Sequence, residues 1–82
     1  MNKTVTFIEN YLKAINFIEG EYIIKETQDS MGLLITIDVK KGHPSIGILI
    51  GKEGQNINLL KNVTRIIGLL ERVNPFIKVN II

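Results

Sequence analysis

The 82-residue chain contains no cysteine, only two prolines and one histidine, and few aromatic residues, which make up 6% of it. Without cysteine neither a disulfide nor a thiolate zinc site can form, and a reducing compartment is the expected one. No apolar run approaches the length of a membrane span, and the first residues do not resemble a secretory signal. We therefore expect one cytoplasmic domain over residues 1–82, with a modest core.

Side chains that carry catalytic chemistry are scarce as well. No paired carboxylates, metal-ligating cluster or nucleophile–base pair can be assembled from the sequence. We therefore expect no enzyme, no cofactor, no metal site and no small-molecule substrate. The single histidine, His43, is expected to cap a helix or to lie exposed.

Charge is unevenly distributed along the chain, although the formal net charge is only +2. Residues 1–39 contain three basic and six acidic side chains, whereas residues 40–82 contain seven basic and two acidic ones. The second half suits an anionic partner. The simpler alternative is a chance segregation of solvated charges.

Hydrophobic periodicity predicts the order helix, strand, strand, helix, loop, helix, strand. Val5, Ile8 and Leu12 recur at helical spacing, and the odd residues from Leu33 to Val39 alternate as in a half-buried strand. The expected elements are a helix between Asn2 and Gly20, strands at 21–28 and 33–40, helices at 44–50 and 55–70, and a strand at 76–82. This order favours an α+β fold in which helices pack on one apolar face of a three-stranded sheet.

Two further surfaces follow from the same pattern. The other sheet face is expected to meet water, through Thr36, Asp38, Lys78 and Asn80. The last helix has a wider apolar stripe than the ~100° that a surface helix needs. The apolar residues beyond that width are Leu59, Ile66 and Leu69, and they form a candidate self-association surface.

The most informative segment is the loop at 51–54, which reads Gly-Lys-Glu-Gly between two expected helices. Glycine permits backbone angles that are closed to other residues, and it lets a sugar-phosphate strand approach the main chain. Gly54 and Gln55 open the next helix, whose free N–H groups favour a phosphate, and Lys52 adds charge. The spacing does not fit a Walker loop or a dinucleotide fingerprint. The alternative is a simple corner between two helices.

With its flanks, the segment Ile-Gly-Ile-Leu-Ile-Gly-Lys-Glu-Gly-Gln-Asn-Ile at 46–57 resembles the Ile-Gly-x-x-Gly-x-x-Ile signature of the KH domain. The element order αββααβ resembles the type II KH topology. Over its whole length the chain is similar to small stand-alone bacterial KH proteins of the KhpA type, and the KH domain of Jag/KhpB-like proteins is a second resemblance. The resemblance implies non-catalytic binding of single-stranded RNA, whose sugar-phosphate backbone the loop holds beside an apolar groove for the bases.

The resemblance also implies a set of RNA-binding residues in the loop and in the helices on either side of it. These are Gly47, Ile48, Gly51, Lys52, Glu53, Gly54, Gln55 and Asn58. It further suggests Ile35 and Ile37 as the floor of the groove. Lys61 and Arg65, one helical turn apart, either extend the phosphate contacts or are merely solvated.

Two residues depart from the family pattern. Family loops usually carry basic residues and no acid, but here Glu53 offsets Lys52, and Gln55 stands where arginine is common. The expected partners are single-stranded RNA, a second copy of the chain or a KhpB-like protein, with single-stranded DNA left open. The alternative function is a degenerate KH domain that acts as a protein-interaction or dimerisation module with little nucleic-acid affinity.

Overall fold

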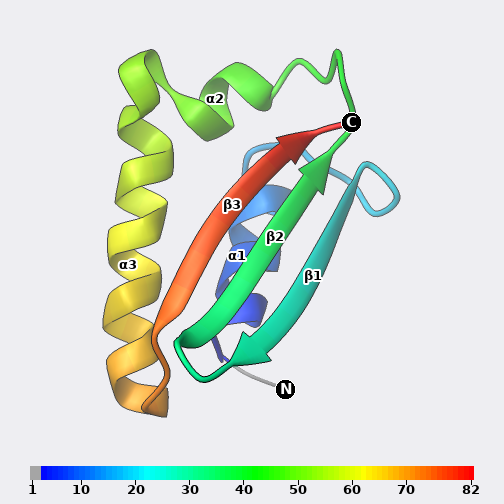
Figure 1. The fold of residues 1–82 in the computed structure, drawn as a ribbon. Coiled ribbons are helices and arrows are strands. Elements are labelled where there is room, and N and C mark those ends of the chain that lie inside the picture. The colour runs from blue at the N-terminus through cyan, green and yellow to red at the C-terminus, as the bar shows by residue number, and fades with distance from the viewer. Residues whose placement is uncertain (1–2) are drawn as a thin grey trace.

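The computed structural model describes residues 3–82, which form helices and one three-stranded sheet (Figure 1). The elements are α1 (Lys3–Ala14), β1 (Tyr22–Asp29), β2 (Gly32–Val39), α2 (Ile46–Ile50), the 3-10 turn η1 (Lys52–Gly54), α3 (Gln55–Glu71) and β3 (Pro75–Ile81). The predicted α+β class and the order αββααβ are confirmed.

The sheet has the strand order β1-β2-β3, with β1 antiparallel to β2 and β2 parallel to β3. In the parallel pair, Leu33 lies opposite Pro75 and Val39 opposite Ile81. Parallel neighbours require a long crossover connection, and here α2, η1 and α3 form it. The Gly51–Gly54 loop therefore lies within the connection between two adjacent strands.

The hydrophobic core lies on one face of the sheet, with α1 behind the strands and α3 alongside β3 in Figure 1. Its buried side chains are Ile8, Leu12, Phe17, Leu33, Ile35, Ile37, Val39, Leu49, Leu60 and Ile77. Strict alternation in β2 supplies four of them. Ile35 and Ile37 are 0% exposed, so the expectation that they form the floor of a groove is wrong.

α1 ends at Ala14, well before the predicted end at Gly20. Asn16 follows with a left-handed φ of 75°, and this turn brings Phe17 into the core, where it is 1% exposed. The helix stops early because the chain must bury this ring before it reaches β1. Asn2, which marks the predicted start of this helix, lies outside the described residues.

The N-terminus of α1 is capped from the far end of α3. Glu71 Oε1 accepts hydrogen bonds from the N–H groups of Lys3 and Thr4 at 2.9 and 3.2 Å, and from the Thr4 hydroxyl at 3.4 Å. A carboxylate at this position satisfies helix N–H groups that otherwise lack a partner and complements the helix dipole. The cap joins residues 67 and 68 positions apart in the chain, so no local pattern indicates it.

The sheet face opposite the core is not wholly polar. Asp38, expected to be exposed, is only 5% exposed, because it pairs with Lys25 Nζ at 3.0 Å and accepts a hydrogen bond from Asn80 Nδ2 at 3.1 Å. These two neighbours, Lys25 first, hold the pKa of Asp38 below its usual value. Apolar side chains share this face and stay partly exposed, namely Ile23, Leu34 and Phe76.

Candidate functional site

The Gly51–Gly54 loop joins α2 to α3 through a turn in which three of the four residues have a positive φ. The φ angle is 75° at Gly51, 55° at Glu53 and 76° at Gly54. The N–H of Gly54 donates to the carbonyl of Gly51 at 3.2 Å, and Gln55, at φ −57°, returns the chain to a helix. Glycine adopts these angles freely, whereas Glu53 is held in a region that side chains disfavour.

Gly51 is required for a second reason, because Asn56 lies directly against it. A Cβ at position 51 would stand 2.7 Å from Asn56 Cγ and 2.8 Å from its backbone nitrogen. Asn56 Nδ2 in turn donates to the carbonyl of Ile48 at 2.7 Å, which ties the first turn of α3 to α2. Asn56 is not among the residues predicted from the sequence, because its only local signal is the tendency of asparagine to bond nearby backbone groups.

Two backbone donors of the loop have no acceptor among the described residues. Within residues 3–82, the N–H groups of Lys52 and Glu53 donate to no acceptor, while those of Gly54 and Gln55 close the turn on the carbonyls of Gly51 and Lys52. A right-handed residue followed by a left-handed one, as at Lys52 and Glu53, orients successive N–H groups toward the same side, which makes a concave site for anions. The N-terminus of α3 adds the positive end of its dipole.

The side-chain charge of the loop is close to zero. Lys52 and Glu53 are both exposed, and neither belongs to an ion pair in the described part of the chain. Attraction for an anion therefore comes from the backbone N–H groups more than from the side chains.

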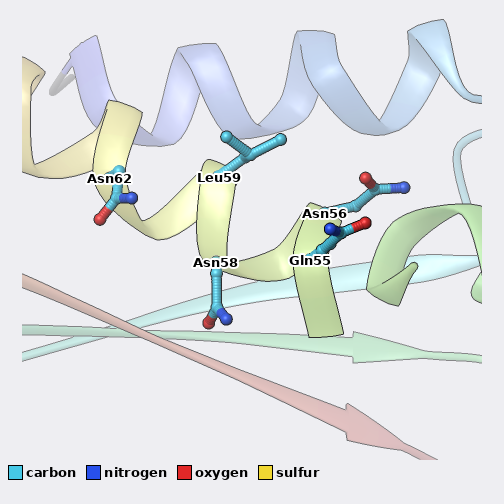
Figure 2. Close-up of a pocket in the computed structure, with 5 residues that line it drawn as sticks. All are labelled: Gln55, Asn56, Asn58, Leu59 and Asn62. Carbon is cyan, nitrogen blue, oxygen red and sulfur yellow. The ribbon is translucent and has the colours of Figure 1, made fainter. Parts of the chain in front are cut away.

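A shallow pocket of about 350 Å³ lies on the first two turns of α3, beside the loop (Figure 2). It is lined by Gln55, Asn56, Asn58, Leu59 and Asn62. Figure 2 shows these side chains on successive turns of α3, with Asn58 and Leu59 on opposite sides of the helix in this view. Amides supply hydrogen-bond donors and acceptors, and Leu59 supplies an apolar wall, a combination that suits a flat polar ligand.

All eight predicted site residues lie in one continuous stretch over α2, the loop and α3. Gln55 and Asn58 share the pocket, whereas Gly47 and Ile48 do not line it. Ile48 is nevertheless 51% exposed and is linked to the pocket through Asn56. A Cβ at Gly47 would meet nothing within 4 Å, so the surface of α2 is open there.

His43 lies beneath the start of α2 and is neither exposed nor a helix cap. Its side chain is 6% exposed, and its ring stacks on Phe17 at 4.1 Å between centroids. His43 Nδ1 accepts the N–H of Ser45 at 3.0 Å, so Nε2 carries the proton and donates to Glu21 Oε1 at 2.8 Å. Because Ser45 immediately precedes α2, the imidazole links Glu21 to the residue just before that helix.

α3 carries another exposed surface, which we call the apolar stripe. It consists of Leu59, Val63, Ile66, Leu69 and Leu70. The exposure predicted for Leu59, Ile66 and Leu69 is confirmed, at 62%, 61% and 78%. Positions 59, 63, 66 and 70 follow the alternating spacing of four and three residues that forms a seam between two helices.

No described helix is long and apolar enough to cross a membrane. Residues 3–82 contain no group of three or more histidine, aspartate or glutamate side chains that could hold a metal ion. No family model, curated protein or solved structure matches the chain. What the chain does is therefore inferred from its own residues and their geometry.

Proposed function

We propose that this chain is a non-catalytic single-stranded RNA-binding protein with a type II KH fold. The observation that carries the proposal is the Gly51–Gly54 loop, where two helices meet at a turn with three positive-φ residues and with two N–H groups that have no acceptor among residues 3–82. The αββααβ order supports it. So do Gly47 and Ile57, which stand at the signature positions on either side of the loop.

In this proposal the backbone of the loop binds phosphate. The N–H groups of Lys52 and Glu53 donate to its oxygens, the two glycines let the strand approach, and the Lys52 ammonium adds one charge-assisted contact. The KH loop characteristically clamps about four nucleotides of backbone. Ile48 gives the bases an apolar wall, while Gln55 and Asn58 offer amides to their edges.

One copy is expected to bind weakly. The loop has a single cation, and the Glu53 carboxylate offsets it, so few positive charges of the protein contact phosphates. We therefore expect a Kd of about micromolar or weaker and a shallow salt dependence. A second copy, or a partner such as a KhpB-like protein that brings its own RNA site, would raise the affinity through effective concentration.

The test replaces Lys52 and Glu53 together by aspartate. Aspartate tolerates the left-handed backbone at position 53, so the fold should survive. With the cation gone and a second carboxylate in the loop, we expect mixed-sequence single-stranded RNA to bind at least about tenfold more weakly in a fluorescence anisotropy titration.

Lys3→Asp is the matched control, because it makes the same change in net charge at the opposite end of α3. Lys3 lies beside Glu71, and the 17 residues of α3 separate it from the loop by about 25 Å. The control should bind RNA as the unaltered chain does. Unchanged binding by the folded loop variant would show that the loop is not the site.

The apolar stripe favours a second candidate function, a degenerate KH domain that serves as a dimerisation or protein-interaction module. Five large apolar side chains on one helix remain exposed, at 37–78%. Sizing the protein in solution with and without short RNA separates the two functions. A dimer without RNA affinity at low salt would favour the second candidate over the first.

A further inference from the structure

Asn56 connects the two helices on either side of the loop through its side chain. Its Nδ2 donates to the carbonyl of Ile48, eight residues earlier in α2, at 2.7 Å. α2 has only five residues, and the last carbonyls of a helix have no partner further along that helix. The N–H of Gly51 satisfies the carbonyl of Gly47 at 2.8 Å, and Asn56 satisfies that of Ile48. A side chain of α3 thus helps to close the end of α2.

The turn between the two helices is packed around this side chain. Gly51 has a φ of 75° and a ψ of 172°, a backbone conformation that only glycine adopts readily. A Cβ at position 51 would stand 2.7 Å from Asn56 Cγ and 2.9 Å from Asn56 Nδ2, so the amide occupies the space that a side chain there would need. This close fit constrains where the chain leaves α2 and enters the loop.

The backbone of the loop does not by itself attach α3 to α2. Two backbone bonds, donated by Gly54 and Gln55, close the turn on the carbonyls of Gly51 and Lys52. Both bonds lie within the turn, so they leave its orientation relative to α2 open. The Asn56 side chain supplies the attachment between the helices. The direction of the two N–H groups that have no acceptor among the described residues therefore depends on this side chain.

The bond between Asn56 and Ile48 is exposed to water, so the fold depends on it little. Ile48 is 51% exposed, and water can satisfy its carbonyl if the amide is removed. A water molecule does not hold the two helices together, however, so the geometry of the turn would be lost. The bond is therefore placed to set the shape of the loop more than the stability of the fold.

We propose that Asn56 is a positioning residue for the phosphate-binding loop. It does not contact RNA, but it holds α2 against α3 so that the N–H groups of Lys52 and Glu53 meet one phosphate. This inference rests on the proposed function and adds a residue that acts through the backbone of the loop. A loop that adopts the binding geometry only about a tenth of the time binds about tenfold more weakly.

The test is Asn56→Ala, which removes the amide and leaves a residue that favours a helix. Asn10→Ala is the matched control, because Asn10 is exposed within α1. Both variants should unfold near the same urea concentration as the unaltered chain. In a fluorescence anisotropy titration with mixed-sequence single-stranded RNA, Asn56→Ala should bind about tenfold more weakly and the control should be unchanged. Unchanged binding by Asn56→Ala would overturn the proposal.

Backbone ¹⁵N relaxation at Lys52 and Glu53 separates positioning from a direct contact with RNA. Without RNA, these two N–H groups should be more mobile in Asn56→Ala than in the unaltered chain or the control. With saturating RNA they should become as ordered as in the unaltered complex, because the phosphate selects the same loop geometry. Weaker binding with no change in mobility would show that Asn56 contacts RNA itself, and the positioning role would be wrong.

Failure of this inference can be told apart from failure of the proposed function. If the unaltered chain binds no RNA, the proposed function is wrong, while relaxation of the free protein still decides whether Asn56 orders the loop. Should Asn56→Ala fail to fold, Asn56→Asp takes its place in the relaxation measurement, because its carboxylate keeps the shape of the amide but cannot donate to the Ile48 carbonyl. If neither variant folds, the role of Asn56 is structural and the proposal is overturned.

Discussion

Glu53 is the residue at which the loop departs most from what phosphate binding favours. A non-glycine residue at a φ of 55° costs about 1–2 kcal/mol, because Cβ approaches the backbone. Its carboxylate also lies beside the N–H groups that we propose for phosphate. The side chain is exposed, and no ion pair in the described residues holds it. The fold therefore does not require this residue, and its charge is free to limit affinity.

Glu53→Asn should raise RNA affinity without loss of stability. Asparagine tolerates the left-handed backbone and removes the negative charge. We expect Kd to fall about fivefold, or ~1 kcal/mol, the interaction of two unit charges near 4 Å in water. Glu19→Asn, an exposed acid outside the loop, is the control for net charge in the same titration. Equal gains in both variants would assign the effect to net charge alone.

At the scale of elements, the fold depends on contacts between helices that no single segment encodes. Glu71 at the end of α3 caps α1, and His43 links the end of the α1–β1 connection to the start of α2. Each contact joins two elements through at least one partly buried hydrogen bond, so removing one partner leaves the other unsatisfied.

Glu71→Gln should therefore destabilise the protein through α1. The amide keeps one acceptor oxygen but loses the charge that complements the helix dipole, and we expect a loss of about 1 kcal/mol in the free energy of unfolding. Urea denaturation followed by circular dichroism measures it. Glu9→Gln, an acid inside α1, makes the same chemical change away from the helix end. A loss of equal size there would exclude the capping role of Glu71.

The order of elements could be predicted from the sequence because it depends on local periodicity and on turn residues. What could not be predicted depends on partners distant in the chain. α1 stops at Ala14 because Phe17 enters the core, and Asp38 is buried because Lys25 and Asn80 reach it from both neighbouring strands. Likewise, the loop was predicted, but the Asn56 bond that holds it depends on a carbonyl eight residues away.

For the whole molecule, stability is linked to pH through two carboxylates. The pKa of Asp38 is lowered by Lys25 and then Asn80, and that of Glu21 by the N–H of Ile18 and then His43. Each of these carboxylates has a lower pKa in the folded protein than in the unfolded chain. Its ionised form therefore stabilises the fold, and this contribution is complete at pH values above the unfolded pKa. That stability is lost as pH falls through the folded pKa.

The melting temperature should thus stay level above about pH 5 and fall as pH drops through and below about 4, near the usual pKa of these groups. Asp38→Asn keeps an oxygen acceptor but cannot titrate, so its melting temperature should decline less steeply between pH 5 and 3. Differential scanning calorimetry over this range measures both slopes. Parallel slopes for the two proteins would show that Asp38 does not contribute to acid unfolding.

The parallel pairing of β2 with β3 has a consequence for how the chain assembles. Leu33 and Pro75 are partners in the sheet, but α2, the loop and α3 separate them along the chain. Closing so long a connection costs chain entropy before the contacts between β2 and β3 can offset it. The hairpin of β1 and β2 has only a short turn to close, so it is expected to form first and β3 to join later. A nascent chain that has not yet reached β3 therefore has only the first of its two strand pairings, and its core still lacks Ile77.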